Sequence, residues 1–214
     1  MKRKLIAAAA IFLLWGACAT AHRLDEYLQA ALISVEKDRV DVSLRLVPGV
    51  AVSAAVLASI DSNGDGILAE IEKRAYAERV LGDLSLTVDG KALKPKLVAM
   101  NFSSAEQMKE GLGEIHVDFT AELPSGGRER KLVLENHHQS QMAAYLVNCL
   151  VPSDPEIQIV VQKRNERQSF YELDYVQGGK RVNTAMMNWT ERRGVWIAGL
   201  LFLACVVCWV TRSY

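Results

Sequence analysis

The stretch from Asp61 to Glu72 constrains the fold of this chain more than any other. It reads DSNGDGILAEIE and fits the calcium-loop pattern D-x-[DN]-x-[DN]-G-x5-E at every constrained position. Calcium is a hard cation that takes about six to eight oxygen ligands, which this pattern collects from one tight turn between two helices. The expected ligands are the side chains of Asp61, Asn63 and Asp65, the carbonyl oxygen of Ile67 and both carboxylate oxygens of Glu72.

Two further positions of this stretch agree with a calcium loop. Gly66 stands where the backbone bends sharply and a side chain would obstruct the turn. Ala69 has no side-chain oxygen, so a water molecule is expected to take its place among the ligands. The alternative interpretation is an ordinary polar turn between two elements, without a bound ion.

Helical periodicity flanks the stretch on both sides. Apolar residues recur at helical spacing from 50 to 60 and again from 69 to 81. We therefore expect an EF-hand, which is a helix–loop–helix calcium unit, as an insertion at residues 50–82. Only one such stretch occurs in the chain, and a lone EF-hand favours a structural calcium site over a sensor.

Most of the remaining sequence alternates apolar and polar residues, which is the period of a half-buried strand. The alternation is clearest over residues 39–47. Asp89 and Gly90 predict a tight hairpin after residues 84–88, with residues 93–102 as the return strand. About nine such short segments predict a mainly β domain over residues 22–176, either a β-sandwich or an open barrel.

Residues 1–21 have the three parts of a secretory signal peptide. A basic start is followed by an apolar run, and small residues stand at positions 19 and 21. Cleavage after Ala21 makes His22 the first residue of the mature chain. The alternative is a lipoprotein processed before Cys18.

Residues 194–210 form a second apolar run without charge. Its length of about seventeen residues is at the short end of what spans a bilayer. Tryptophans lie near both ends, where indole rings favour the membrane interface. We expect a single transmembrane helix here, preceded by a polar stalk at 177–193 and followed by a short tail at 211–214; the alternative is a buried C-terminal helix. With the signal peptide, this anchor places the domain in the periplasm or outside the cell.

Composition excludes some classes of function. The 25 Lys and Arg residues balance the 25 Asp and Glu residues, so the charge gives no reason to expect a nucleic-acid partner. Cys149 is the one cysteine between the signal peptide and the apolar anchor, so that region cannot form an internal disulfide.

Several stretches together resemble the extracytoplasmic N-terminal domain of HupE/UreJ-type membrane proteins. They are residues 21–24, residues 36–46, the calcium loop, residues 145–148 and residues 152–155. Members of that group are linked with nickel or cobalt handling. They continue into several membrane helices, whereas one anchor is expected here. The resemblance therefore implies a shared exported domain and does not imply transport.

The histidines offer a second candidate metal site. After cleavage, His22 carries a free amine and an imidazole, which together can chelate copper or nickel, with other histidines completing the site. His116, His137 and His138 are the remaining candidates. On a strand, His137 and His138 point to opposite faces, so one of them at most joins such a site easily. Ordinary surface histidines are the alternative interpretation.

The sequence shows no nucleophile motif, no H-E-x-x-H and no phosphate-binding glycine loop, so we expect no enzyme. The function expected is a membrane-anchored, extracytoplasmic calcium-binding protein that serves as a binding or accessory module for a protein partner the sequence does not identify. The alternative is a copper, nickel or cobalt chaperone, or a transporter accessory, that uses His22.

N-terminal sequencing of the mature protein is expected to begin at His22, because signal peptidases cleave after small residues at positions such as 19 and 21. Any other first residue removes the amine ligand and with it the transition-metal site built on His22. A lipid-modified chain that begins at Cys18 supports the lipoprotein alternative instead.

Overall fold

The structure, a computed structural model, describes residues 25–178 of the chain. The predicted signal peptide, His22, the transmembrane helix at 194–210 and the tail at 211–214 lie outside these residues, as does most of the predicted stalk. Among residues 25–178, no helix is long and apolar enough to cross a membrane.

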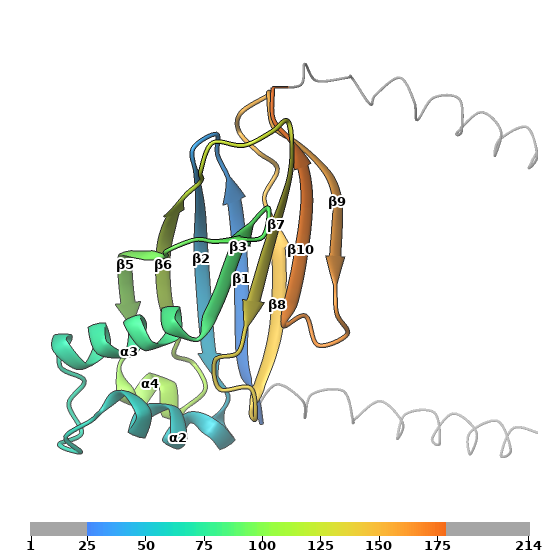
Figure 1. Ribbon diagram of the computed structural model, residues 1–214. Coiled ribbons are helices and arrows are strands. Elements are labelled where there is room, and N and C mark those ends of the chain that lie inside the picture. The colour runs from blue at the N-terminus through green and yellow to red at the C-terminus, as the bar shows by residue number, and fades with distance from the viewer. Residues whose placement is uncertain (1–24, 179–214) are drawn as a thin grey trace, which may run out of the picture. The chain divides into compact units, whose positions relative to one another are not determined.

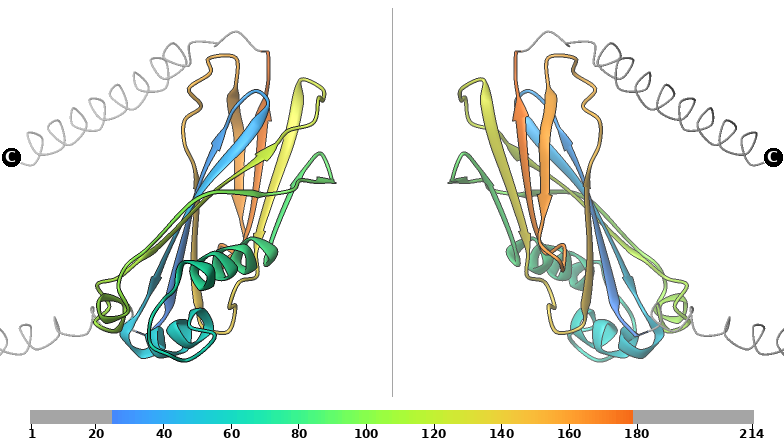
Figure 2. Two further views of the ribbon diagram at one scale, coloured as in Figure 1. Left: turned by 90° about the vertical axis from the view of Figure 1, so that its left-hand side faces the viewer. Right: turned by 90° about the vertical axis from the view of Figure 1, so that its right-hand side faces the viewer.

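Ten strands form two sheets of five, which lie as separate layers in Figure 2. The mainly β sandwich is therefore confirmed, and residues 25–178 contain no strand pairing that would join the sheets into a barrel. All strand pairs are antiparallel except β1 with β8. The first sheet contains, in order across it, β5 (Lys96–Phe102), β6 (Ile115–Glu122), β2 (Arg39–Pro48), β1 (Tyr27–Val35) and β8 (Ala143–Cys149). The second sheet contains, in order, β4 (Lys91–Ala92), β3 (Leu84–Val88), β7 (Glu129–Asn136), β10 (Phe170–Val176) and β9 (Gln158–Arg164).

The expected return strand over residues 93–102 is wrong in one respect. Asp89 and Gly90, with φ of 51° and 75°, form the predicted tight turn, but only Lys91 and Ala92 pair back to β3. The chain then leaves this sheet around Pro95, which has no N–H to donate to a strand neighbour, and enters the first sheet as its edge strand β5. The return strand of the hairpin is thus the short β4, and the strand expected over residues 93–102 is β5 at residues 96–102, in the other sheet.

The helices gather at one end of the sandwich (Figure 1). α2 (Val50–Ile60) follows β2 of the first sheet, and α3 (Glu70–Gly82) leads into β3 of the second, so the helix pair is also the crossing between sheets. α3 packs against β3 and β5, while α2 packs against the short helix α4 (Ala105–Lys109). The insertion expected at residues 50–82 has these boundaries.

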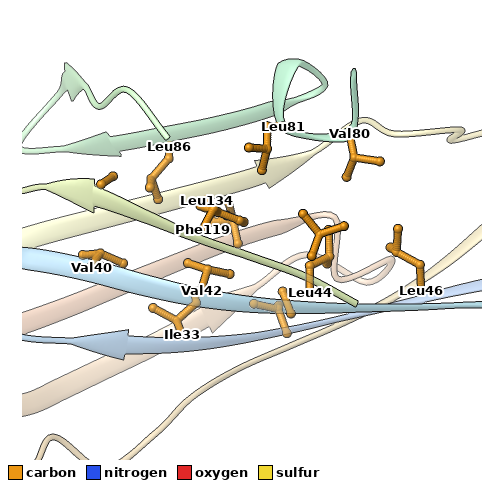
Figure 3. Packing of buried hydrophobic residues seen from close by; sticks show 14 of the residues in the cluster. Ile33, Val40, Val42, Leu44, Leu46, Val80, Leu81, Leu86, Phe119 and Leu134 are labelled. Carbon is orange, nitrogen blue, oxygen red and sulfur yellow. The ribbon is translucent and has the colours of Figure 1, made fainter. Parts of the chain in front are cut away.

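Alternating apolar residues from both sheets fill the space between them. Val42 of β2 and Phe119 of β6 face Leu86 and Leu134 of the opposite sheet (Figure 3). Val80 of α3 continues the same cluster and is fully buried. Because α3 adds side chains to this core, the helix pair is part of the domain rather than an appendage.

The free edge of β8 is covered by side chains from the second sheet. The carbonyl oxygen of Val147 accepts a hydrogen bond of 2.9 Å from Nε of Arg164, and the Val147 N–H donates one of 3.5 Å to Oε1 of Gln168. Exposed strand edges invite pairing with other chains, and groups that are already bonded oppose it.

We expect Leu173→Ala to lower the free energy of unfolding by about 2–5 kcal/mol, because Leu173 of β10 is fully buried between the sheets. The matched control is Val160→Ala on the neighbouring strand β9, where the side chain is 61% exposed and the loss should stay below about 1 kcal/mol. Urea unfolding followed by intrinsic fluorescence measures both. Equal losses would contradict the placement of the core.

Candidate functional site

The predicted calcium loop lies between the two helices of the insertion. Asp61 is the C-cap of α2, and Ala69 is the N-cap of α3. The residues between them are mostly exposed, whereas the helix residues on both sides reach into the core. The loop is therefore a solvent-facing turn whose two ends are fixed by packing.

The loop folds around the carboxylate of Asp61. Its two oxygens accept hydrogen bonds from the N–H of Gly64 at 2.8 Å and from the N–H of Gly66 at 2.9 Å. Both glycines have a left-handed backbone, with φ of 75° and 81°, which residues with a side chain rarely adopt. The sharp bend expected at Gly66 is confirmed.

Asn63 and Asp65 hold the middle of the loop. Oδ1 of Asn63 accepts from the N–H of Asp65 at 2.9 Å, and Oδ1 of Asp65 accepts from the N–H of Ile67 at 2.8 Å. The amide of Asn63 also donates to the second carboxylate oxygen of Asp65 at 3.0 Å. Side-chain oxygens from alternate residues thus line one short, exposed turn.

Glu72 closes the loop from its far end. One carboxylate oxygen accepts from the hydroxyl and the N–H of Ser62, both at 2.9 Å, and the other accepts from the N–H of Ala69 at 3.1 Å. These bonds, led by the one from the Ser62 hydroxyl, lower the pKa of Glu72 and keep it charged. The last expected ligand therefore lies against the start of the loop, next to Asp61.

The donor set of this loop suits calcium. Every expected ligand atom is an oxygen, and the three carboxylates are hard, anionic donors. As the side chains stand, no three His, Cys, Asp or Glu groups in residues 25–178 converge closely enough to hold a metal ion. The carboxylates of Asp61 and Glu72 each accept hydrogen bonds from backbone N–H groups of the loop.

The structure does not bring the candidate histidines together. His116 lies on β6 and contacts Glu114 at 2.7 Å, and His137 is an exposed residue after β7 that contacts Glu135 at 3.2 Å. His138 is buried, and both of its ring nitrogens are already bonded within the domain. His22 lies outside the described residues, so its metal site stays a prediction.

His138 belongs instead to a chain of four polar side chains, of which Tyr27, Tyr76 and His138 are buried and Asp83 is 44% exposed. The hydroxyls of Tyr27 on β1 and Tyr76 on α3 lie 2.6 Å apart, and the Tyr76 hydroxyl lies 3.0 Å from Nε2 of His138. Nδ1 of His138 lies 2.8 Å from the carboxylate of Asp83, the C-cap of α3. The chain was not predicted, because its members are far apart in the sequence and none belongs to a motif.

Further hydrogen bonds connect the backbone of His138 to both sheets. The carbonyl oxygen of His138 accepts from the side chains of Gln29 on β1 at 2.8 Å and Tyr145 on β8 at 3.1 Å. Its N–H donates to the Asn136 side chain at 2.9 Å, and Asn136 donates in turn to Gln29 at 2.9 Å. His138 is thus the point at which α3, the first sheet and the second sheet meet.

The hydrogen bonds from Tyr27 to Asp83 all run in one direction. A carboxylate only accepts, so Nδ1 of His138 carries the hydrogen and Nε2 accepts from the hydroxyl of Tyr76. Tyr76 in turn accepts from the hydroxyl of Tyr27. A second proton on His138 would place a hydrogen on Nε2 and so remove the acceptor that the Tyr76 hydroxyl uses.

Burial sets the protonation of this chain. Burial lowers the pKa of His138 and the charge of Arg79 lowers it further, while the bond to Asp83 opposes both. Burial raises the pKa of Tyr76 to about 12. At neutral pH the histidine and the tyrosines are therefore uncharged. Tyr27 and Tyr76 are fully buried, so a substrate in solution does not reach them.

Comparison with known proteins gives no match, either to a protein-family model or to a curated sequence. The site is therefore interpreted from its own chemistry.

We expect the domain to lose stability as the pH falls below about 6.5. The unfolded chain then binds a proton at His138, which the folded chain resists because its pKa is lowered. One such group changes the free energy of unfolding by at most about 1.4 kcal/mol per pH unit.

Melting temperatures measured between pH 7.5 and 5.5 test this expectation. His138→Gln should flatten the profile in this range. His137→Gln, at an exposed position, is the control and should leave the slope unchanged. An equal slope in wild type and His138→Gln would contradict the assignment.

Proposed function

We propose that this protein is an extracytoplasmic, membrane-anchored calcium-binding module, and that calcium is a structural part of it. The observation that carries the proposal is the closed loop from Asp61 to Glu72. Its first and last predicted ligands are brought to the same end of the loop by hydrogen bonds, and Gly66 makes the bend that the pattern requires. The helix–loop–helix at residues 50–82 is then an EF-hand.

The proposed ligands are the five positions predicted from the sequence. Calcium supplies a divalent charge that offsets the mutual repulsion of the three carboxylates. Asp61, Asn63 and Asp65 contribute side-chain oxygens and Ile67 its carbonyl oxygen. Glu72 contributes its carboxylate, which gives up the bonds to Ser62 and Ala69 when it turns toward the ion.

The packing of the helices favours a structural role over a sensor role. A sensor opens its helices when calcium binds and exposes an apolar groove. Here Val56 and Ile60 of α2, and Tyr76 and Val80 of α3, are already buried in the core of the domain. Opening the helix pair would break the sandwich itself. A weak site suffices outside the cytoplasm, where calcium reaches roughly millimolar concentration.

The location and the partner remain proposals drawn from the sequence. The signal peptide at 1–21 and the apolar run at 194–210 support a domain exported from the cytoplasm and held at a membrane. The likeness to HupE/UreJ-type exported domains supports an accessory role beside another membrane protein. The alternative, a copper, nickel or cobalt protein, requires His22 to be the mature N-terminus. Metal analysis of protein purified without chelator tests it.

Calcium titration of the exported domain is expected to raise its melting temperature, because the ion binds the folded loop and not the unfolded chain. The stabilisation should reach about 2.7 kcal/mol when free calcium is a hundred times the dissociation constant. Chelator should reverse it and reduce helicity in circular dichroism, since the loop carboxylates then repel one another. If calcium changed neither the melting temperature nor the helicity, the proposal would be contradicted.

Glu72→Gln is expected to weaken calcium binding about tenfold or more, because it removes a charge and a bidentate ligand. Glu70→Gln is the matched control: Glu70 lies in the same helical turn, but its side chain is 79% exposed and pairs with Lys73. Its dissociation constant should stay within about twofold of wild type. Isothermal titration calorimetry measures both, and equal affinities for the two variants would remove Glu72 from the site.

A further inference from the structure

α3 carries residues of two different polar sites. Glu72, in its first turn, is a proposed calcium ligand, and Tyr76 stands four residues later on the same side of the helix. Both side chains are buried, although the loop next to Glu72 is exposed. Asp83, at the end of the helix, closes the buried chain through His138. One rigid element of 13 residues therefore connects the loop to the centre of the domain.

The other end of the loop is tied to the same region. Nη1 of Arg79 on α3 donates to the carbonyl oxygen of Ser59 at 3.1 Å, two residues before Asp61. Nε2 of Gln139, which follows His138, lies 3.3 Å from the hydroxyl of Ser59. Both helices that hold the first and last calcium ligands thus depend on contacts around Tyr76 and His138.

The backbone reinforces this arrangement at the end of α3. The N–H of His137 donates to the carbonyl oxygen of Asp83 at 3.0 Å, beside the bond between the His138 ring and the Asp83 carboxylate. The hydroxyl of Tyr76 links the Tyr27 hydroxyl to the His138 ring by hydrogen bonds, and the rings of Tyr27 and His138 also meet edge to face. Removing that oxygen breaks the chain in the middle and leaves two buried polar groups, on Tyr27 and His138, without partners.

We propose that Tyr76 is a positioning residue for the calcium site: its hydroxyl, bonded to Tyr27 and His138, holds α3 where Glu72 meets the start of the loop, so that calcium binding and the meeting point of the two sheets stabilise each other. The inference rests on the calcium site proposed above. Coupling between two sites is reciprocal. The hydrogen bonds of Tyr27, Tyr76 and His138 therefore strengthen calcium binding, and bound calcium stabilises these hydrogen bonds by the same factor.

The test is calcium titration of the purified full-length protein, kept in mild detergent, with calcium chloride as the only added ligand. Tyr76→Phe removes one oxygen and is expected to raise the dissociation constant about tenfold. Tyr175→Phe is the matched control, because it removes the same atom from a tyrosine that is 1% exposed and whose hydroxyl has no hydrogen-bond partner among the described residues. Its dissociation constant should stay within about twofold of wild type.

A second control separates positioning from general loss of stability. Ile33→Val deletes one buried methyl group from β1 and is expected to lower the melting temperature. It leaves the hydrogen-bonded side chains around Tyr76 unchanged. It should leave the affinity for calcium unchanged. An increase in the dissociation constant as large as that of Tyr76→Phe would show that any destabilisation weakens calcium binding, and would overturn the proposal.

Hydrogen exchange provides the reciprocal measurement. Calcium should slow exchange of the His138 amide, which is bonded to Asn136, in wild type but not in Tyr76→Phe. A wild-type protein that binds no calcium overturns the calcium site and the coupling together. A wild-type protein that binds calcium no more tightly than Tyr76→Phe overturns the coupling alone.

Discussion

The packing of α3 into one end of the sandwich is the interaction on which the rest of the domain depends. Tyr76 and Val80 extend the apolar core from the strands into the helix, and the hydroxyl of Tyr76 reaches the point where both sheets meet. Without this helix, the core residues at that end of the sheets would face water. The helix pair also carries the chain from the first sheet to the second, so its position sets how the two layers stack.

The domain handles polar groups in two opposite ways. In the loop, the carboxylates of Asp61 and Asp65 are at least partly exposed and accept hydrogen bonds from backbone N–H groups at no large desolvation cost, so they remain available to a cation. Around His138, buried polar groups are satisfied by one another and by the carboxylate of Asp83, which specifies a single arrangement of the elements. α3 contributes residues to both regions, so the chemistry of the surface loop can affect the interior through this helix.

Local interactions explain what the sequence predicts well here. The loop is held by bonds between residues at most ten positions apart, and the helices of the insertion lie where the helical periodicity predicts them. Strand alternation predicted the buried residues of β2 for the same reason. The errors arise from distant contacts. The parallel pairing of β1 with β8, the move of β5 to the first sheet and the burial of His138 all depend on partners that no local pattern specifies.

The pairing of β1 with β8 has a consequence for how the chain folds. Tyr27 lies beside Ala143, so the strand that begins the described domain finds one of its neighbours only near the other end of that domain. Closing so long a loop costs entropy before the contact is made, and topologies of this kind fold slowly. A chain that is synthesised from its N-terminus must hold β1 and β2 as an incomplete sheet until β8 has been made. The bonds from Arg164 and Gln168 to the free edge of β8 form later still, when the hairpin that follows is complete.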